Sequence, residues 1–275
     1  MKTFKQKAKK LCQNKKISAG ASFLIILLLA MYVLPSQNPY ESSDESLLTS
    51  SWDHLLGTDT SGFDLYSRVL EGGKISLKIS FFSILISMLI GSFLGVISGY
   101  FGGIIDNIIN FVCDILVVVP DVILAILLLI FLPNSAYTLV IVLSITNIPS
   151  FIRLIRGKTL IITEKDFIKS AEALGATKTR IIFKHIVPNL RDTLITRFVV
   201  GMSTIILTIS GLCFIGLGVD ASKPEWGNIL GSAKENIRFH PHIFYGPFII
   251  ISLTSLSFNL IGKGLITYFD PKQKK

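Results

Sequence analysis

Long uninterrupted apolar runs are the feature that most constrains the fold of this chain. Two of them, residues 17–34 and 75–100, are each long enough to cross a bilayer as a helix. Further apolar runs lie at roughly 104–132, 137–154, 194–218 and 243–265. Only 16% of the 275 residues are charged, against about a quarter in typical soluble domains. The sequence therefore predicts an all-α, polytopic membrane protein with six transmembrane helices.

Charged residues predict the orientation of these helices. Residues 1–16 contain seven lysines and no acid, whereas segment 36–74 contains seven acids and only two basic residues. Between residues 153 and 197 there are ten basic residues and four acids. Because basic residues concentrate on the cytoplasmic side, we expect both termini and the segment between the fourth and fifth helices to be cytoplasmic. No small-residue cleavage site follows the first run, so we expect it to remain as a helix.

A polar stretch at residues 167–189 interrupts this apolar pattern. Thr163 followed by Asp166 predicts a helix N-cap, after which Phe167, Ala171 and Leu174 would share one helical face. Gly175 is typical of a left-handed helix end. Beyond it, we expect Thr177 to cap a second short helix that carries Ile181, Ile182 and Ile186 and that Pro188 limits. The prediction is an elbow of two short helices with small residues at its tip, which suits either a docking site or an amphipathic hairpin on the membrane surface.

Small residues recur at every fourth position of the second apolar run. The members of this stripe are Ser83, Ser87, Gly91, Gly95 and Gly99. Such spacing allows two helix backbones to approach closely in lipid. The pattern fits packing against another subunit and packing against a helix of the same chain equally well.

Three aspartates, Asp106, Asp114 and Asp121, lie along the third run and would form one stripe on a continuous helix. Intramembrane acids are candidates for a proton path, so a proton-coupled secondary transporter is the alternative function. We favour a structural interpretation, in which Asp106 lies at the water interface and Asp121, directly after Pro120, begins a restarted helix. Only Asp114 would then need a buried partner.

Several blocks of the chain resemble one known family. Ala-Leu-Gly-Ala-Thr at 173–177, together with His-Ile-Val-Pro-Asn at 185–189, is similar to the cytoplasmic "EAA" loop of binding-protein-dependent ABC importer permeases, in their peptide/nickel branch. Blocks at 55–68, 214–219 and 225–228 resemble the same branch. Ile209 and Gly211 depart from many peptide permeases in the manner of nickel-type members. Peptide, nickel and a metal chelate therefore all remain possible solutes.

This resemblance implies a permease subunit and its partners. The domains would be a basic N-terminus (1–16), a first helix with an external loop (17–74), the importer transmembrane domain (75–268) and a cytoplasmic tail (269–275). The loop between helices 4 and 5 would be the coupling loop that docks an ATPase. Its docking residues would be Ser170, Ala171, Glu172, Ala173, Leu174, Gly175 and Ala176. The implied partners in a bacterial plasma membrane are a second homologous permease, two cytoplasmic ATP-binding subunits, an extracytoplasmic solute-binding protein and membrane lipid.

The sequence lacks the motifs that are typical of other functional classes. Gly157-Lys158-Thr159 ends like a phosphate-binding loop, but Ile152 stands where that loop needs glycine and no strand precedes it. We therefore expect no cofactor on this chain, with ATP used only by partner subunits, and no catalytic residues. His240 and His242 lack a third ligand, so we expect no metal site. Despite a net charge of +9, no nucleic-acid-binding pattern is present.

Overall fold

The computed structural model describes residues 14–43 and 45–269 of the chain. Most of the predicted basic N-terminus and all but one residue of the predicted C-terminal tail lie outside the described residues. Within the described residues all regular elements are helices, and only two isolated β-bridges occur, Ser42 with Phe63 and Thr58 with Asp64. The prediction of an all-α fold is confirmed.

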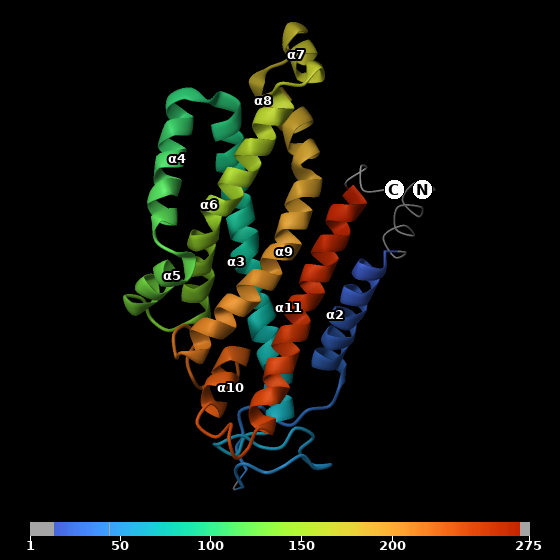
Figure 1. Cartoon of the computed structure of the whole chain (residues 1–275), viewed down its shortest axis with the longest axis vertical. Helices are drawn as coiled ribbons and strands as arrows, with labels where there is room; N and C mark the ends of the chain where they lie inside the picture. The colour runs from blue at the N-terminus through green and yellow to red at the C-terminus, as the bar shows by residue number, and fades with distance from the viewer. Residues whose placement is uncertain (1–13, 44, 270–275) are drawn as a thin grey trace. The chain divides into compact units, whose positions relative to one another are not determined.

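The helices follow the chain in the order shown in Figure 1. Their bounds are α2 Lys15–Val33, α3 Leu65–Phe101, α4 Gly103–Val118, α5 Asp121–Ile130, α6 Ala136–Thr163, α7 Asp166–Ala173, α8 Lys178–Ile181, the π-helix η1 Ile182–Ile186, α9 Val187–Phe214, α10 Trp226–Ala233 and α11 His242–Phe269.

Five of the described helical segments are long and apolar enough to cross a membrane, and a bent pair raises the number to six if it counts as one span. The pair is α4 and α5, which meet at an angle of 82°. The predicted restart of the helix after Pro120 is confirmed, whereas the size of the bend was not predicted. Pro120 stands at the break and cannot continue a helical hydrogen-bond ladder, and Asp121 begins α5 as predicted.

Helix α3 begins ten residues before the apolar run that predicted it. Asp64 explains the early start, because its Oδ2 accepts hydrogen bonds from Ser67 N at 2.8 Å and from Ser67 Oγ at 2.6 Å. A carboxylate at this position satisfies amide groups that the first turn of a helix leaves unpaired. Hydrophobic run length thus marks the membrane-crossing part of α3 but not its beginning.

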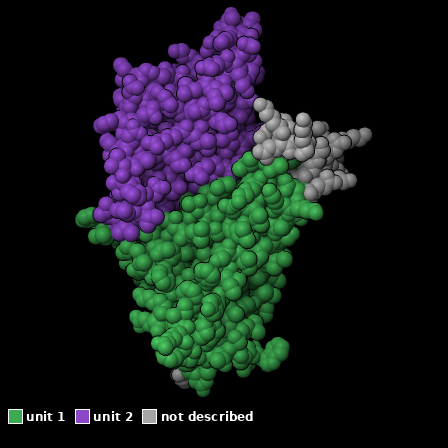
Figure 2. All heavy atoms as spheres, viewed as in Figure 1, with its two compact units in different colours: residues 1–81, 129–140, 199–275 green, residues 82–128, 141–198 purple. Residues whose placement is uncertain are grey.

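The described chain forms two compact units, which Figure 2 colours separately. Unit 1 contains residues 1–81, 129–140 and 199–275, of which the structure describes those from 14 on, except 44 and the last six. Unit 2 contains residues 82–128 and 141–198.

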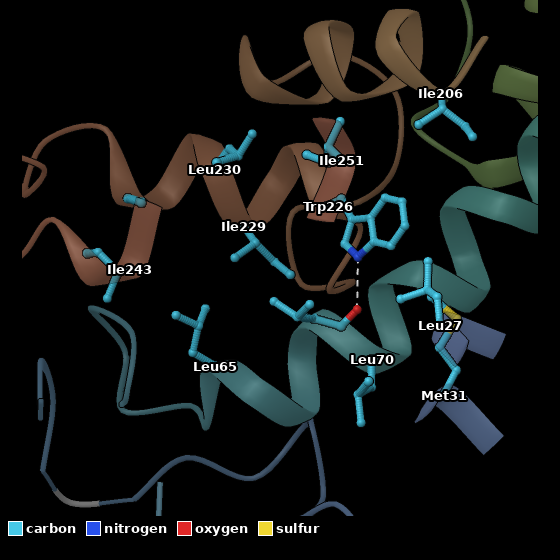
Figure 3. Close-up of a cluster of buried hydrophobic side chains, with 12 residues drawn as sticks. Leu27, Met31, Leu65, Leu70, Ile206, Trp226, Ile229, Leu230, Ile243 and Ile251 are labelled. Atoms are coloured by element: carbon cyan, nitrogen blue, oxygen red, sulfur yellow. Dashed lines mark hydrogen bonds between the residues drawn. The ribbon is translucent and has the colours of Figure 1, made fainter. Parts of the chain in front are cut away.

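A tryptophan lies at the centre of the core of unit 1. The Trp226 side chain is fully buried, and its indole Nε1 donates a hydrogen bond to Val69 O at 2.8 Å (Figure 3). Apolar side chains from α2, α3, α10 and α11 surround it, including Met31, Leu70 and Ile251. The preceding residue, Glu225, is also fully buried and caps α10.

Glu225 is held in place by three hydrogen bonds. Its carboxylate accepts from Ser76 Oγ at 2.7 Å, Gly227 N at 2.6 Å and Asn228 N at 3.2 Å. Burial raises the pKa of this carboxyl group, whereas the hydrogen bonds act in the opposite direction. The Glu225 contacts join α10 to α3, and so fix the short helix within unit 1.

Close packing of α3 against α6 forms the centre of unit 2. A β-carbon added at Gly91 would lie 2.5 Å from Phe151 Cβ, and one at Gly95 would lie 2.9 Å from Ile152 O. Ser87 Oγ also donates to Ser144 O at 3.0 Å. Two backbones can approach this closely only where side chains are minimal.

Candidate functional site

The elbow at residues 166–189 begins differently from the prediction. Lys165, and not Thr163, is the N-cap of α7, and no side chain caps the helix there. Thr163 is instead the last residue of α6, where its hydroxyl donates to Leu160 O at 2.8 Å. A threonine hydroxyl can bond to a carbonyl of its own preceding turn as readily as it caps a new helix, and α6 offered that carbonyl.

The end of α7 has the geometry that its sequence predicts. Gly175 has φ +79°, in the left-handed region. Its N–H donates to Glu172 O at 2.9 Å, and Ala176 N–H donates to Ala171 O at 3.0 Å. This pair of bonds is the Schellman arrangement that closes a helix C-terminus at glycine. Thr177 then caps α8, accepting a hydrogen bond from Arg180 N at 3.3 Å.

Of the three residues predicted to share one face of α7, only Ala171 is buried. Ile168 and Ala171 are buried, whereas Phe167 is 42% exposed and Leu174 is 87% exposed. The N-cap lies two residues later than predicted, at Lys165, and Ile168, not Phe167, is the side chain that packs. The Phe167 ring instead lies beside the His185 ring, with 6.2 Å between their centroids.

The second half of the elbow is the beginning of the fifth span and not a separate short helix. α8, η1 and α9 form one helical run, Lys178–Phe214, and Pro188 lies inside it. Proline lacks an N–H and its ring crowds the carbonyl four residues earlier. The preceding π-turn relieves this conflict, because Val187 N–H bonds to Ile182 O, five residues back. The prediction that Pro188 ends the helix was wrong.

The predicted docking residues form the exposed tip of the elbow. Ser170, Glu172, Ala173, Leu174 and Gly175 are exposed, Ala176 is half-buried, and Ala171 is turned inward. A β-carbon added at Gly175 would meet no atom of this chain within 4 Å. The tip therefore presents open backbone and one exposed leucine.

Two of the three predicted intramembrane acids are paired with arginines of α6. Asp114 Oδ1 lies 2.8 Å from Arg153 Nη2, and Asp106 receives two 2.6 Å hydrogen bonds from Arg156. The Asp114 side chain is 67% exposed, so the expectation of a buried partner was wrong about burial. The break at Pro120 also places Asp121 on a differently directed helix. A continuous proton-carrying stripe is thus not formed by these acids.

The stripe of small residues on α3 lies against α6 of the same chain. In addition to Gly91 and Gly95, a β-carbon at Gly99 would lie 2.8 Å from Arg156 O. Ser83 O accepts a hydrogen bond from Ser144 Oγ at 3.2 Å. The sequence left the partner of this stripe open, because spacing alone does not identify the facing helix.

Together, the fold and the elbow define a class of protein. A helical membrane protein with several spans and a short polar helix between two of them has the architecture of a membrane transport component.

Comparisons with known proteins identify the family. The family described as "binding-protein-dependent transport system inner membrane component" matches residues 91–275. The glutathione transport system permease protein GsiD of Salmonella typhimurium is 38% identical over 267 residues, covering 95% of this chain and 88% of that protein. The proteins of the same name from Pectobacterium atrosepticum and Escherichia coli O6:K15:H31 are 36% and 35% identical, over 95% and 93% of this chain.

The chain belongs to this family of binding-protein-dependent permeases. It is a permease component of an ABC transport system, and it is a multi-pass membrane protein. The family implies a partner ATPase and a substrate-binding protein. No observation supports the proton-coupled alternative, which the stripe of three aspartates had suggested from sequence alone.

Proposed function

We propose that this chain is one half of the translocation pathway of a bacterial importer and that its elbow is the docking site for an ATP-binding subunit. In this proposal it pairs with a second, homologous permease above two cytoplasmic ATPases, and an external solute-binding protein delivers the solute. Both termini are cytoplasmic, as the distribution of basic residues favours. All ATP binding belongs to the partner subunits.

The exposed tip of the elbow is the observation that carries this proposal. Leu174 is 87% exposed at the end of a polar helix, and the residues around it are mostly small. Ile168 and Ala171 are buried and hold α7 in place. Such an arrangement offers a partner one exposed apolar side chain at the end of a packed helix, with close access to the backbone around it.

For the solute we propose a small peptide of the glutathione type. The relatives named for glutathione transport align with nearly the whole chain. Nickel and metal chelates, which two sequence positions had kept open, receive no support from these relatives. Because an external binding protein selects the solute in this class, transport assays with that protein present are the relevant measurement.

The docking proposal can be tested by adding bulk to the elbow tip. Valine at Gly175 costs about 1–2 kcal/mol in the left-handed region and also projects into the space that a docked ATPase would occupy. Ala173→Arg adds bulk on the exposed side of α7 without backbone strain. We expect both variants to reach the membrane and to lose ATPase association and solute-stimulated ATP hydrolysis in the reconstituted complex.

Gly102→Val is the matched control. Gly102 has φ +64°, ψ −159° and open space around it, a conformation that is almost exclusive to glycine, so valine is at least as strained there but lies outside the elbow. Normal ATPase coupling in this control, together with loss in the two elbow variants, is the expected result. Normal coupling in Ala173→Arg would refute docking at this tip.

A further inference from the structure

An apolar groove in unit 2 has no part in the proposed docking of the ATPase. Its volume is about 470 Å³, and it lies between α3, from Met88 to Phe101, and the run from Ile182 to Leu194 on η1 and α9. The walls are apolar except for Ser92. Two of its phenylalanines are largely exposed, Phe93 at 63% and Phe183 at 67%.

The shape of the groove fits a lipid chain. The part of α3 that lines it is about 20 Å long at 1.5 Å per residue. That length is close to the depth of one leaflet with its headgroups, since a bilayer is about 40–45 Å thick when the headgroup regions are included. The groove therefore runs along the helices over a distance that one acyl chain would follow, and its apolar walls do not suit a polar solute.

The charges at one end of the groove fit an anionic headgroup. Lys178 Nζ lies 5.6 Å from the centroid of the Phe101 ring, which forms that end of the groove. Residues 178–190 contain Lys178, Arg180 and Lys184 and no acid, whereas Arg191 is paired with Asp192 at 3.3 Å. Basic residues beside an apolar surface at the cytoplasmic face attract anionic lipids.

The packing of α3 argues against a second helix in the groove. Helix contacts in membranes concentrate small residues at the interface. The small residues of α3 already face α6, and the face that lines the groove is bulky and carries Phe93 and Phe101. We propose that this groove binds one acyl chain of an anionic phospholipid of the inner leaflet, with the lipid phosphate beside Lys178.

Photo-crosslinking distinguishes this occupant from a protein partner. The photoreactive analogue p-benzoylphenylalanine would replace Phe183 in the full chain, expressed in a bacterial membrane that contains phosphatidylethanolamine and phosphatidylglycerol. The control position is Ile108, which lies on α4 and is 58% exposed. Mass spectrometry of the crosslinked chain then reports the headgroup of each attached lipid.

We expect lipid adducts at position 183 to be enriched in phosphatidylglycerol about fivefold over those at position 108, the factor that one lysine near a membrane surface provides. Lys178→Gln should reduce this ratio to that of position 108, whereas Lys158→Gln, an exposed lysine on α6 outside the groove, should leave it unchanged. A crosslink from position 183 to another permease chain, or equal headgroup composition at the two positions, would overturn the proposal.

Discussion

The contact between α3 and α6 gives the sharpest quantitative prediction. A β-carbon introduced by Gly91→Ala would lie 2.5 Å from Phe151 Cβ and 3.0 Å from Ile148 O. Carbon atoms in contact prefer a separation of about 3.5–4.0 Å, so the closest approach is short by about 1 Å. Both neighbouring atoms belong to, or are bonded to, the α6 backbone, and therefore the two helices must separate locally.

The size of the effect follows from two opposing contributions. Overpacking of this kind costs about 1–3 kcal/mol, whereas replacing glycine by alanine inside a helix contributes about 1 kcal/mol of stabilisation. Gly157→Ala is the matched control, because Gly157 lies inside α6 and an added β-carbon would meet no atom within 4 Å. The difference between the two variants isolates the steric cost, and we expect Gly91→Ala to be less stable by about 1–3 kcal/mol.

Reversible unfolding of the purified chain in mixed micelles, titrated with dodecyl sulfate and followed by circular dichroism, would measure this difference. Equal stability of the two variants would show that α3 and α6 are not packed as described. If Gly91→Ala instead kept its stability but no longer associated with a second permease, the stripe of small residues would be an interface between subunits.

Two further predictions concern topology and the acids of α4. A reporter fused after Ser50 or Lys234 should behave as external, and one after Lys178 as cytoplasmic, since basic residues concentrate at the inner ends; a cytoplasmic signal at Ser50 would reverse the assignment. Asp114→Asn should assemble nearly normally, because asparagine has the same shape and its side-chain oxygen can still accept the hydrogen bond from Arg153, and its transport in proteoliposomes should remain ATP-driven. Wild-type transport that depends on a proton gradient, and loses that dependence in Asp114→Asn, would favour a carrier.

Local backbone chemistry made the tip of the elbow predictable. Gly175 adopts a positive φ because a helix end of this kind requires one, and the hydroxyl of Thr177, the residue directly after the tip, caps α8. Both signals act over a few residues and need no knowledge of tertiary structure. The apolar runs were equally informative about the spans, since hydrocarbon thickness alone sets their minimum length.

Features that depend on residues far apart in the chain could not be predicted from such local sequence signals. The widened turn before Pro188 and the pairing of Asp114 with Arg153 both arise from how helices meet in space. The sequence placed Asp114 in a span but gave no indication that an arginine 39 residues later would face it. The buried face of α7 depends similarly on which side chain the rest of unit 2 can accommodate, and Ile168 was favoured over Phe167.

The buried cluster around Ile168 gives the proposed ATPase docking site a mechanical connection to the spans. Ile168 of α7 belongs to one buried cluster with Ile155 and Ile162 of α6, and with Ile186 and Leu190 at the start of the fifth span. Close-packed side chains transmit displacement because they have little free volume to absorb it. In the docking proposal, a force on the exposed tip therefore reaches α6 and α9 together through Ile168, in addition to the two chain connections. A rigid-body motion of packed helices is the response that such a cluster favours.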